Sequence, residues 1–287
     1  MVGTKSQADA DASATVRGGD SFPDGALRIY GLIGDPVSQV RAPFPITHRL
    51  RQAGLNAALL PLHVPADEVS SIFGSLKAIR NIDGLVITVP HKIPMAGLVD
   101  HLSERATLVG AINIARREAD GSWHGDILDG VAFEHGLTES GFNPKGQRAF
   151  VVGAGGAGCA LAVELVLAGA SVHVFDVSPA RSEALAKRLH EAGHVITVAK
   201  AADPRGAALV VNATPLGMKP DDVLPLDPAL LSANMLVADV VMSPPVTAFL
   251  KQAKERGCHV QLGEVVLLNQ LDVQVEFFRT GGASLRA

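Results

Sequence analysis

Six consecutive small residues, Gly153-Ala154-Gly155-Gly156-Ala157-Gly158, contain the spacing G-x-G-x-x-G. They follow an apolar run over residues 149–152 that predicts a buried strand, and they open an Ala-, Leu- and Val-rich helix over 159–167. In that context Gly153 permits a tight turn, Gly155 lets the backbone approach a pyrophosphate, and Gly158 permits close packing of helix on strand. The helix N-terminus offers free N–H groups to the anion. The motif therefore predicts a dinucleotide site, with a ligand-free glycine turn as the alternative.

Asp176 ends the next expected strand, over residues 171–175, eighteen residues after Gly158. A carboxylate at this position accepts hydrogen bonds from the ribose hydroxyls of NAD and repels the 2′-phosphate of NADP. Arg181 stands nearby and has the charge to bind that phosphate instead. The structural alternative is an Asp that caps the helix expected from residue 179. We therefore expect NAD as the cofactor and leave NADP open.

Strands and helices alternate along the chain, and this alternation predicts βαβ units with mostly parallel sheets. Expected strands cover residues 26–33, 58–64, 85–89, 149–152, 171–175, 208–212 and 236–240. Expected helices cover residues 43–53, 68–79, 159–167, 179–192 and 266–278. We expect an α/β fold of two domains. An α/β catalytic domain would cover 27–126, completed by 266–287, and a doubly wound Rossmann domain would cover 127–265, after a flexible tail over 1–26.

The composition excludes several classes of protein. The chain has 287 residues, of which 47% are hydrophobic and 4% aromatic, with a formal net charge of −4. This acidic balance argues against binding to nucleic-acid phosphates, and the few aromatic residues argue against base stacking. No apolar run of about 18 residues predicts a membrane span. Two cysteines, Cys159 and Cys258, favour a reducing, cytoplasmic compartment. His190 and His194 lack a third ligand, so no metal site is expected.

Seven separated segments together resemble the shikimate/quinate dehydrogenase family. They are Gly31–Pro36, Thr88–Lys92, Gly110–Asn113, Gly125–Gly130, the glycine turn, Asn212–Met218 and Leu267–Gln270. The resemblance implies an N-terminal catalytic domain, a C-terminal Rossmann domain, and a last helix that returns to the first domain. It also implies reversible hydride transfer between a cyclic alcohol and its ketone, in a cleft between the domains.

The resemblance assigns Lys92 and Asp129 as the catalytic pair. An alcohol O–H needs a base in oxidation and a carbonyl oxygen needs an acid in reduction, while an ammonium stabilises the developing alkoxide. Without the resemblance, Lys92 would be a solvated Lys and Asp129 a helix N-cap. The family's substrate-binding positions, which hydrogen-bond the ring hydroxyls, correspond to Thr88, Asn113 and Gln270. The expected nicotinamide side corresponds to Asn212, Ala213 and Thr214.

Departures from the family pattern gather where the substrate carboxylate would bind. Many members have Ser-x-Ser-Pro where this chain has Val40-Arg41-Ala42-Pro43. The family's Tyr aligns with Met242, and the Asn before the family's Thr aligns with Val86. Burying an ion against apolar side chains costs several kcal/mol. We therefore expect a shikimate dehydrogenase-like oxidoreductase with an altered pocket end, formed by Val40, Ala42 and Met242, that prefers a substrate other than shikimate.

Two other functions stay open at this point. One is an authentic shikimate or quinate dehydrogenase, which would reduce 3-dehydroshikimate in aromatic amino-acid biosynthesis or act in quinate catabolism. The other is a nucleotide-sensing binding protein, which would not need both Lys92 and Asp129. As partners we expect a small-molecule cyclic hydroxy substrate and no nucleic acid or membrane, with the chain a monomer or homodimer.

Overall fold

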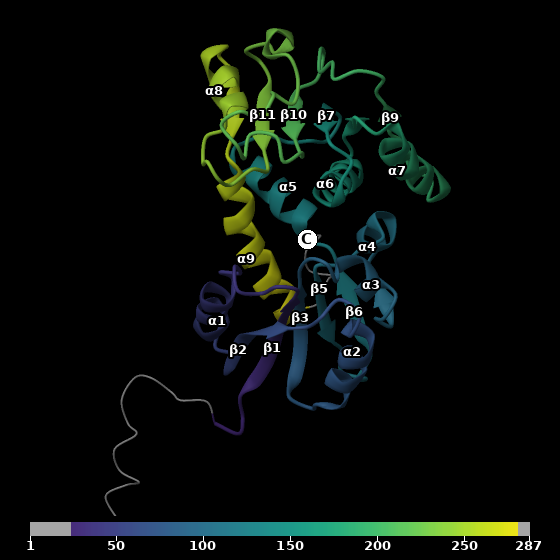
Figure 1. Cartoon of the computed structure of the whole chain (residues 1–287), viewed down its shortest axis with the longest axis vertical. Helices are drawn as coiled ribbons and strands as arrows, with labels where there is room; N and C mark the ends of the chain where they lie inside the picture. Colours follow the sequence, from purple (N-terminus) through teal and green to yellow (C-terminus); the bar gives the residue numbers. More distant parts are fainter. Residues whose placement is uncertain (1–23, 281–287) are drawn as a thin grey trace, which may run out of the picture.

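Two six-stranded sheets with helices packed against them make up the protein in a computed structural model that describes residues 24–280 (Figure 1). The expected α/β class with two domains is confirmed. All but the last three residues of the expected 1–26 tail, and residues 281–287, lie outside the described residues. The domain boundaries at 126/127 and 265/266 stay predictions. Within residues 24–280, no helix combines the length and the apolar character needed to cross a bilayer.

The first sheet is mixed, with three parallel and two antiparallel strand pairs. Its strand order is β2-β1-β3-β5-β6-β4, and β1 pairs parallel with both β2 and β3. Strand β5 pairs antiparallel with β3 and β6, because a tight turn at Asp120-Gly121 folds β5 and β6 into a hairpin. Its strands are β1 (Arg28–Gly34), β2 (Ala57–His63), β3 (Ile82–Ile87), β4 (His101–Leu102), β5 (Ile114–Arg117) and β6 (Trp123–Asp126). Its helices are α1 (Pro43–Gln52), α2 (Val69–Ala78), α3 (Lys92–Ala96) and α4 (Glu104–Val109).

The second sheet has the doubly wound order β12-β11-β10-β7-β8-β9, with every pair parallel. The order reverses between β7 and β10, and such a switch point opens a crevice at the carboxyl ends of the strands. Its strands are β7 (Arg148–Val152), β8 (Ser171–Phe175), β9 (Thr197–Val198), β10 (Leu209–Asn212), β11 (Leu236–Asp239) and β12 (His259–Gln261). Its helices are α6 (Gly156–Leu167), α7 (Pro179–Glu191), α8 (Ala248–Glu255) and the short 3₁₀ helix η2 (Pro228–Leu230).

Two helices, α5 (Asp129–Glu139) and α9 (Gly263–Thr280), connect the sheets. Figure 1 shows α9 running from beside β11 and α8 down to α1 and β1. At its far end Phe277 is fully buried, and Phe278 packs on Tyr30 with ring centroids 4.3 Å apart. Arg116 of β5 lies over the Phe277 ring and donates a hydrogen bond to the Phe277 carbonyl oxygen at 2.9 Å. The last helix therefore returns to the first sheet, as the resemblance implies.

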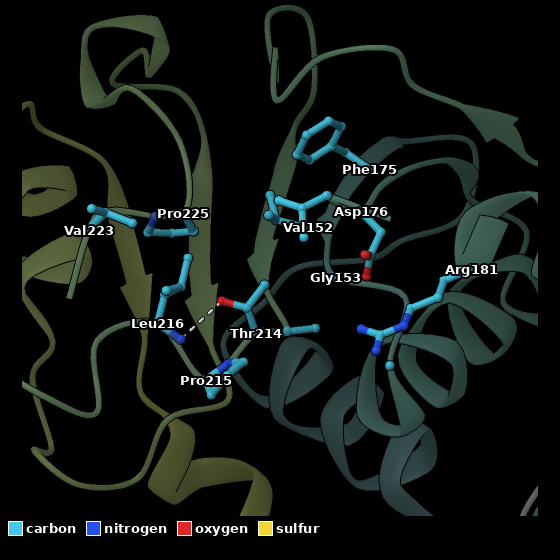
Figure 2. Close-up of a pocket in the computed structure, with 13 residues that line it drawn as sticks. Val152, Gly153, Phe175, Asp176, Arg181, Thr214, Pro215, Leu216, Val223 and Pro225 are labelled. Carbon is cyan, nitrogen blue, oxygen red and sulfur yellow. Dashed lines mark hydrogen bonds between the residues drawn. The ribbon is translucent and has the colours of Figure 1, made fainter. Parts of the chain in front are cut away.

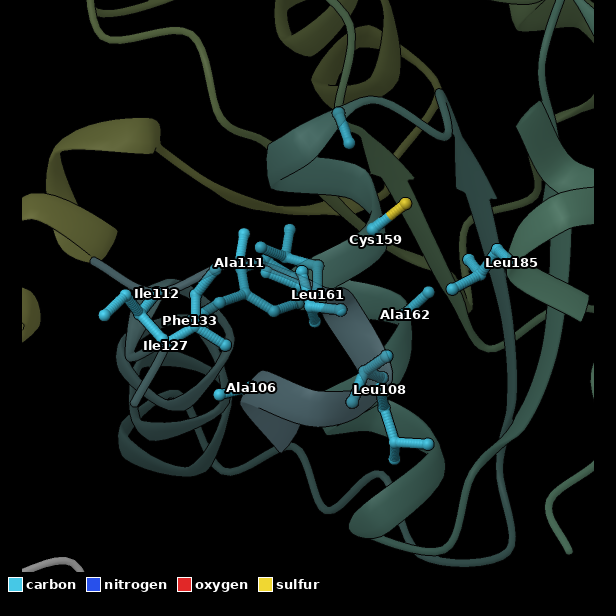
Figure 3. Packing of buried hydrophobic residues seen from close by; sticks show 14 of the residues in the cluster. Ala106, Leu108, Ala111, Ile112, Ile127, Phe133, Cys159, Leu161, Ala162 and Leu185 are labelled. Carbon is cyan, nitrogen blue, oxygen red and sulfur yellow. The ribbon is translucent and has the colours of Figure 1, made fainter. Parts of the chain in front are cut away.

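The apolar core is continuous between the two halves. Figure 3 shows Leu108 and Ile112 of the first half in the same cluster as Phe133 of α5 and Leu161 of α6. A buried ion pair runs alongside it, because Arg105 on α4 lies 3.2 Å from the Glu164 carboxylate on α6. These contacts hold the two halves of the protein together next to the site.

Replacing Phe277 with Ala tests how far the fold depends on the end of α9. The side chain is fully buried, so truncation should leave a cavity and lower the free energy of unfolding by about 3–5 kcal/mol. Phe44 on α1 is 81% exposed and gives a matched control, and Phe44→Ala should change that free energy by less than about 0.5 kcal/mol. Urea denaturation measures both variants. Equal effects would contradict the anchoring role of this helix end.

Candidate active site

A cavity of about 430 Å³ lies at the switch point of the second sheet, where β7, β8 and β10 end (Figure 2). Its walls include Gly153, Gly155, Asp176, Ala213 and Thr214 from the expected cofactor site. Figure 2 shows Asp176 and Arg181 on one wall, across from Leu216, Val223 and Pro225. The structure therefore brings together residues that are separated by about sixty positions in the sequence.

The glycine turn has the backbone that a dinucleotide requires. Gly153 has a φ of 104°, and a Cβ there would lie 2.9 Å from the Ala213 carbonyl oxygen. At Gly158 a Cβ would collide with the carbonyl oxygen of Gly153, so this glycine permits close packing of α6 on β7. At Gly155, which is the N-cap of α6, a Cβ would meet nothing within 4 Å. Space is thus left at the helix N-terminus, and the turn fits a pyrophosphate. Ala154, Gly156 and Ala157 shape the turn without lining the cavity.

Asp176 is 8% exposed, and its carboxylate has structural contacts besides any ribose role. One oxygen accepts a hydrogen bond from the Ala154 N–H at 2.7 Å and the other from the Ser178 N–H at 2.8 Å. Asp176 therefore ties the glycine turn to the end of β8 and helps form the turn before α7. The alternative of a helix-capping Asp is wrong, because the N-cap of α7 is Ser178, and the ribose contact stays a prediction.

Asn212 is fully buried and does not line the cavity, contrary to its expected place beside the nicotinamide. Its amide donates to the Leu216 carbonyl oxygen and the Asp239 carboxylate, both at 3.0 Å, and accepts from the Thr214 hydroxyl at 2.6 Å. Burial raises the pKa of Asp239. Three donors that hydrogen-bond to its carboxylate partly offset this rise. Asn212 thus holds the loop that positions Thr214, and its own place in cofactor binding stays a prediction.

A second cavity, of about 220 Å³, lies at the carboxyl end of β3 beside α9. It brings together the expected substrate and catalytic residues Val40, Ala42, Thr88, Lys92, Asn113, Asp129 and Gln270. Val86 and Leu32 line it too, from the neighbouring strands β3 and β1 of the first sheet. Met242 is the exception, since it is 53% exposed and absent from the walls. The physical reason is that residues 242–246 form an exposed loop after β11, in the second sheet.

The Asp129 carboxylate is the centre of this second cavity. The Lys92 ammonium donates to one oxygen at 2.8 Å. The Asn113 amide and the Gln270 amide donate to the other oxygen, at 2.8 Å and 2.5 Å. The Asn113 side-chain oxygen accepts in turn from the Leu128 N–H at 2.9 Å, which orients its amide. Three separate segments of the chain therefore converge on one carboxylate.

The Lys92–Asp129 pair is suited to proton transfer. The Lys92 side chain is 31% exposed and that of Asp129 17% exposed, so both are reachable from the cavity. Helix α5 begins at Asp129, and its N-cap is Leu128, which makes no side-chain cap. The alternatives of a solvated lysine and a capping aspartate are therefore wrong. An ammonium held in place by a carboxylate can donate a proton to a ketone oxygen or receive one from an alcohol.

The side chains of His91 and Cys159 have structural roles. His91, next to Lys92, is fully buried, and its Nε2 lies 2.8 Å from the Val64 carbonyl oxygen. Cys159 near the start of α6 is buried as well, and burial raises the pKa of its thiol, which disfavours the reactive thiolate. Neither residue lines either cavity.

The sequence analysis missed three cavity residues on α9: Leu267, Leu271 and Gln274. Together with Gln270 they occupy positions i, i+3, i+4 and i+7, which form one face of a helix. This spacing could have predicted the three residues from the sequence, because Gln270 on the same helix face was already expected to bind the substrate.

Comparisons with known proteins agree with this architecture. The family model for the shikimate dehydrogenase substrate binding domain matches residues 32–115. A shikimate dehydrogenase (NADP(+)) of Rubrobacter xylanophilus is 38% identical over 255 residues, covering 86% of this chain and 89% of that protein.

Solved structures are similar over nearly the whole chain. Shikimate 5-dehydrogenase from Listeria monocytogenes, in complex with shikimate and NAD, has a TM-score of 0.83 at 26% identity, covering 90% of this chain and 94% of that one. A ligand-free 5-ketofructose reductase of Gluconobacter has a TM-score of 0.82 at 29% identity, covering 89% and 94%.

This fold and these two cavities define a class of protein. It is an alcohol dehydrogenase in which one domain holds the dinucleotide and the other domain holds the substrate. More narrowly, the chain belongs to the shikimate dehydrogenase family. Enzymes of this type are NAD(P)-dependent alcohol dehydrogenases. The nucleotide-sensing alternative gains no support from these findings.

Two glycine variants should separate cofactor binding from folding. Gly155→Ala adds a methyl group where the protein leaves space, so the free energy of unfolding should change little while NADH and NADPH bind at least about 10-fold more weakly. Gly158→Ala forces α6 away from the turn, so it should lower the stability itself. Urea denaturation and titration of cofactor fluorescence measure the two quantities. Unchanged cofactor affinity in Gly155→Ala would place the pyrophosphate elsewhere.

Proposed function

We propose that this protein interconverts a cyclic alcohol and its ketone by hydride transfer, with Lys92 and Asp129 moving the proton. The observation that carries the proposal is the network on Asp129, in which one ammonium and two amides meet on a carboxylate inside a cavity. A purely structural ion pair has no need of a cavity at its exposed edge. The dinucleotide cavity, with Thr214 on its wall, lies in the neighbouring half of the protein.

Each residue of the network has a separate task. In reduction, Lys92 donates a proton to the ketone oxygen on which negative charge develops, and in oxidation it receives the proton back. Asp129 orients the Lys92 ammonium and accepts a hydrogen bond from the substrate. Asn113 and Gln270 hold Asp129 in place from β5 and α9. Gly153, Gly155 and Thr214 would hold the dinucleotide, which supplies or accepts the hydride when bound.

Two substrate classes are supported by different observations. The relatives named shikimate dehydrogenase favour 3-dehydroshikimate and shikimate as the substrate pair. Their names support an authentic shikimate dehydrogenase better than an enzyme with an altered pocket. The cavity of this chain favours a neutral ring, since Val40, Ala42 and Val86 line it where the family places polar side chains. The similar structure of a 5-ketofructose reductase, named for a neutral keto sugar, supports this second class.

For the cofactor we propose NAD. Asp176 lines the dinucleotide cavity with a carboxylate, which favours a free ribose hydroxyl over a 2′-phosphate. Val177 after it is 88% exposed and brings no positive charge. Relatives named for NADP(+) support the other cofactor, and Arg181 on the same wall is the side chain that would bind its phosphate.

Lys92→Ala tests the proposed reaction. With the proton donor removed, kcat for ketone reduction should fall by about 10²–10⁴-fold, while the affinity for NADH stays near that of the wild type. Lys77 is a matched control, because it is also partly exposed and paired with a carboxylate, Asp100 at 3.5 Å, yet lines neither cavity. Steady-state kinetics with 3-dehydroshikimate and 5-ketofructose measure both the loss and the substrate class. Full activity in Lys92→Ala on either ketone would overturn the proton-transfer role.

Asp176 and Arg181 should act in opposite directions on cofactor choice. Asp176→Asn removes the charge that repels a 2′-phosphate, so the ratio of kcat/KM for NADH over NADPH should fall about 10-fold. Arg181→Ala removes the only cation on the described walls of the cavity, so the same ratio should rise. Both ratios are measured with one ketone. If the ratio stays constant in Asp176→Asn, the carboxylate has only its structural contacts.

A further inference from the structure

Gln274 is a largely buried residue whose side-chain amide makes no hydrogen bond to any other described residue. Its side chain is only 4% exposed and lines the substrate cavity. Over residues 24–280, no side chain or backbone group makes a hydrogen bond to its amide. The amide atoms are not fully enclosed by protein, so they are available to pair with whatever occupies the cavity that Gln274 lines.

The neighbouring amides of α9 are all occupied, which sets Gln274 apart. Asn269 donates to the Glu139 carboxylate at 3.1 Å, and Gln270 donates to Asp129 at 2.5 Å. Gln274 lies one helical turn beyond Gln270 on the same face, about 6 Å further along the axis. The cavity therefore has two polar ends. One end carries the Lys92–Asp129 pair, and the other carries a single neutral amide.

Apolar side chains also form walls of this cavity. Leu32 and Val86 come from β1 and β3, and Val40 and Ala42 come from the segment before α1. In the family pattern an Asn stands at the position of Val86. The polar group has thus been lost from the strand, and Gln274 supplies one from the helix opposite.

We propose that Gln274 is the specificity-determining residue of this cavity and that its amide binds a neutral hydroxyl group of the substrate. This inference rests on the proposed function. An amide offers one acceptor and two donors and no charge, so a hydroxyl group can both donate to it and accept from it. A carboxylate could use only the donors and would remain without a positive partner at this end, which costs several kcal/mol. The preferred substrate is therefore a neutral polyhydroxylated ring.

Gln274→Leu tests the contact, because leucine has a similar volume and no polar atoms. With 5-ketofructose and NADH, kcat/KM should fall at least 10-fold, mostly through a higher KM, because Gln274 does not contact the reacting oxygen. With 3-dehydroshikimate the change should stay below threefold. Gln274→Glu separates the two classes further, since its carboxylate still accepts from a hydroxyl group and repels a carboxylated ring.

Gln261→Leu is a matched control. Gln261 is also 4% exposed and also lacks partners for its amide, but it lines neither cavity. Its kinetics should match those of the wild type. If Gln274→Leu behaves like Gln261→Leu on a ketone that the wild type reduces, the inference is wrong and the proposed function stands. If the wild type prefers 3-dehydroshikimate and Gln274→Leu lowers kcat/KM most for that ketone, the proposed class of neutral substrates is wrong. If the wild type reduces neither ketone, the proposed function fails, and this is seen before any variant is made.

Discussion

The Asp129 carboxylate is the contact on which the site depends. A carboxylate that is only 17% exposed must be compensated, and here one ammonium and two amides do so. These donors come from α3, from the segment before β5 and from α9, while the carboxylate itself begins α5. Compensating this charge therefore fixes four segments relative to one another. The geometry of the proposed catalytic pair and the connection between the two sheets thus depend on the same interaction.

Backbone pairing in the first sheet brings these donors into reach. The Ile87 N–H donates to the Asn113 carbonyl oxygen at 2.7 Å, and the Asn113 N–H donates to the Asp126 carbonyl oxygen at 3.0 Å. Because β5 runs antiparallel to β3, the end of β3 and the start of β5 lie side by side. Thr88, Lys92 and Asn113 thus meet at one edge of the sheet, although more than twenty residues separate the first from the last. A parallel β5 would have carried Asn113 to the opposite edge.

The parts of the site that depend on local sequence could be predicted, and those that depend on packing could not. The glycine turn is local, so its strand–turn–helix context follows from the pattern alone. Lys92, Asp129 and Gln270 were found by resemblance, since no local pattern shows that they meet. Asn212 is a buried loop support, because the partners of its amide come from β11 and from its own loop. Met242 lies in an exposed loop after β11 and outside the cavity walls, so its contact with a substrate stays a prediction that alignment alone cannot test.

The charge balance of the substrate cavity bears on what it can hold. Lys92 and Asp129 are the only charged side chains among the described residues of its wall, and they are already paired at 2.8 Å. A paired ammonium and carboxylate present a dipole, whose attraction for a distant anion falls off faster than that of a free charge. A substrate carboxylate at the Gln274 end would therefore gain little from Lys92 while losing its water. A neutral ring with hydroxyl groups loses less on entering and satisfies an amide that is otherwise unpaired, so the charge balance and the hydrogen-bond accounting favour the same class of substrate.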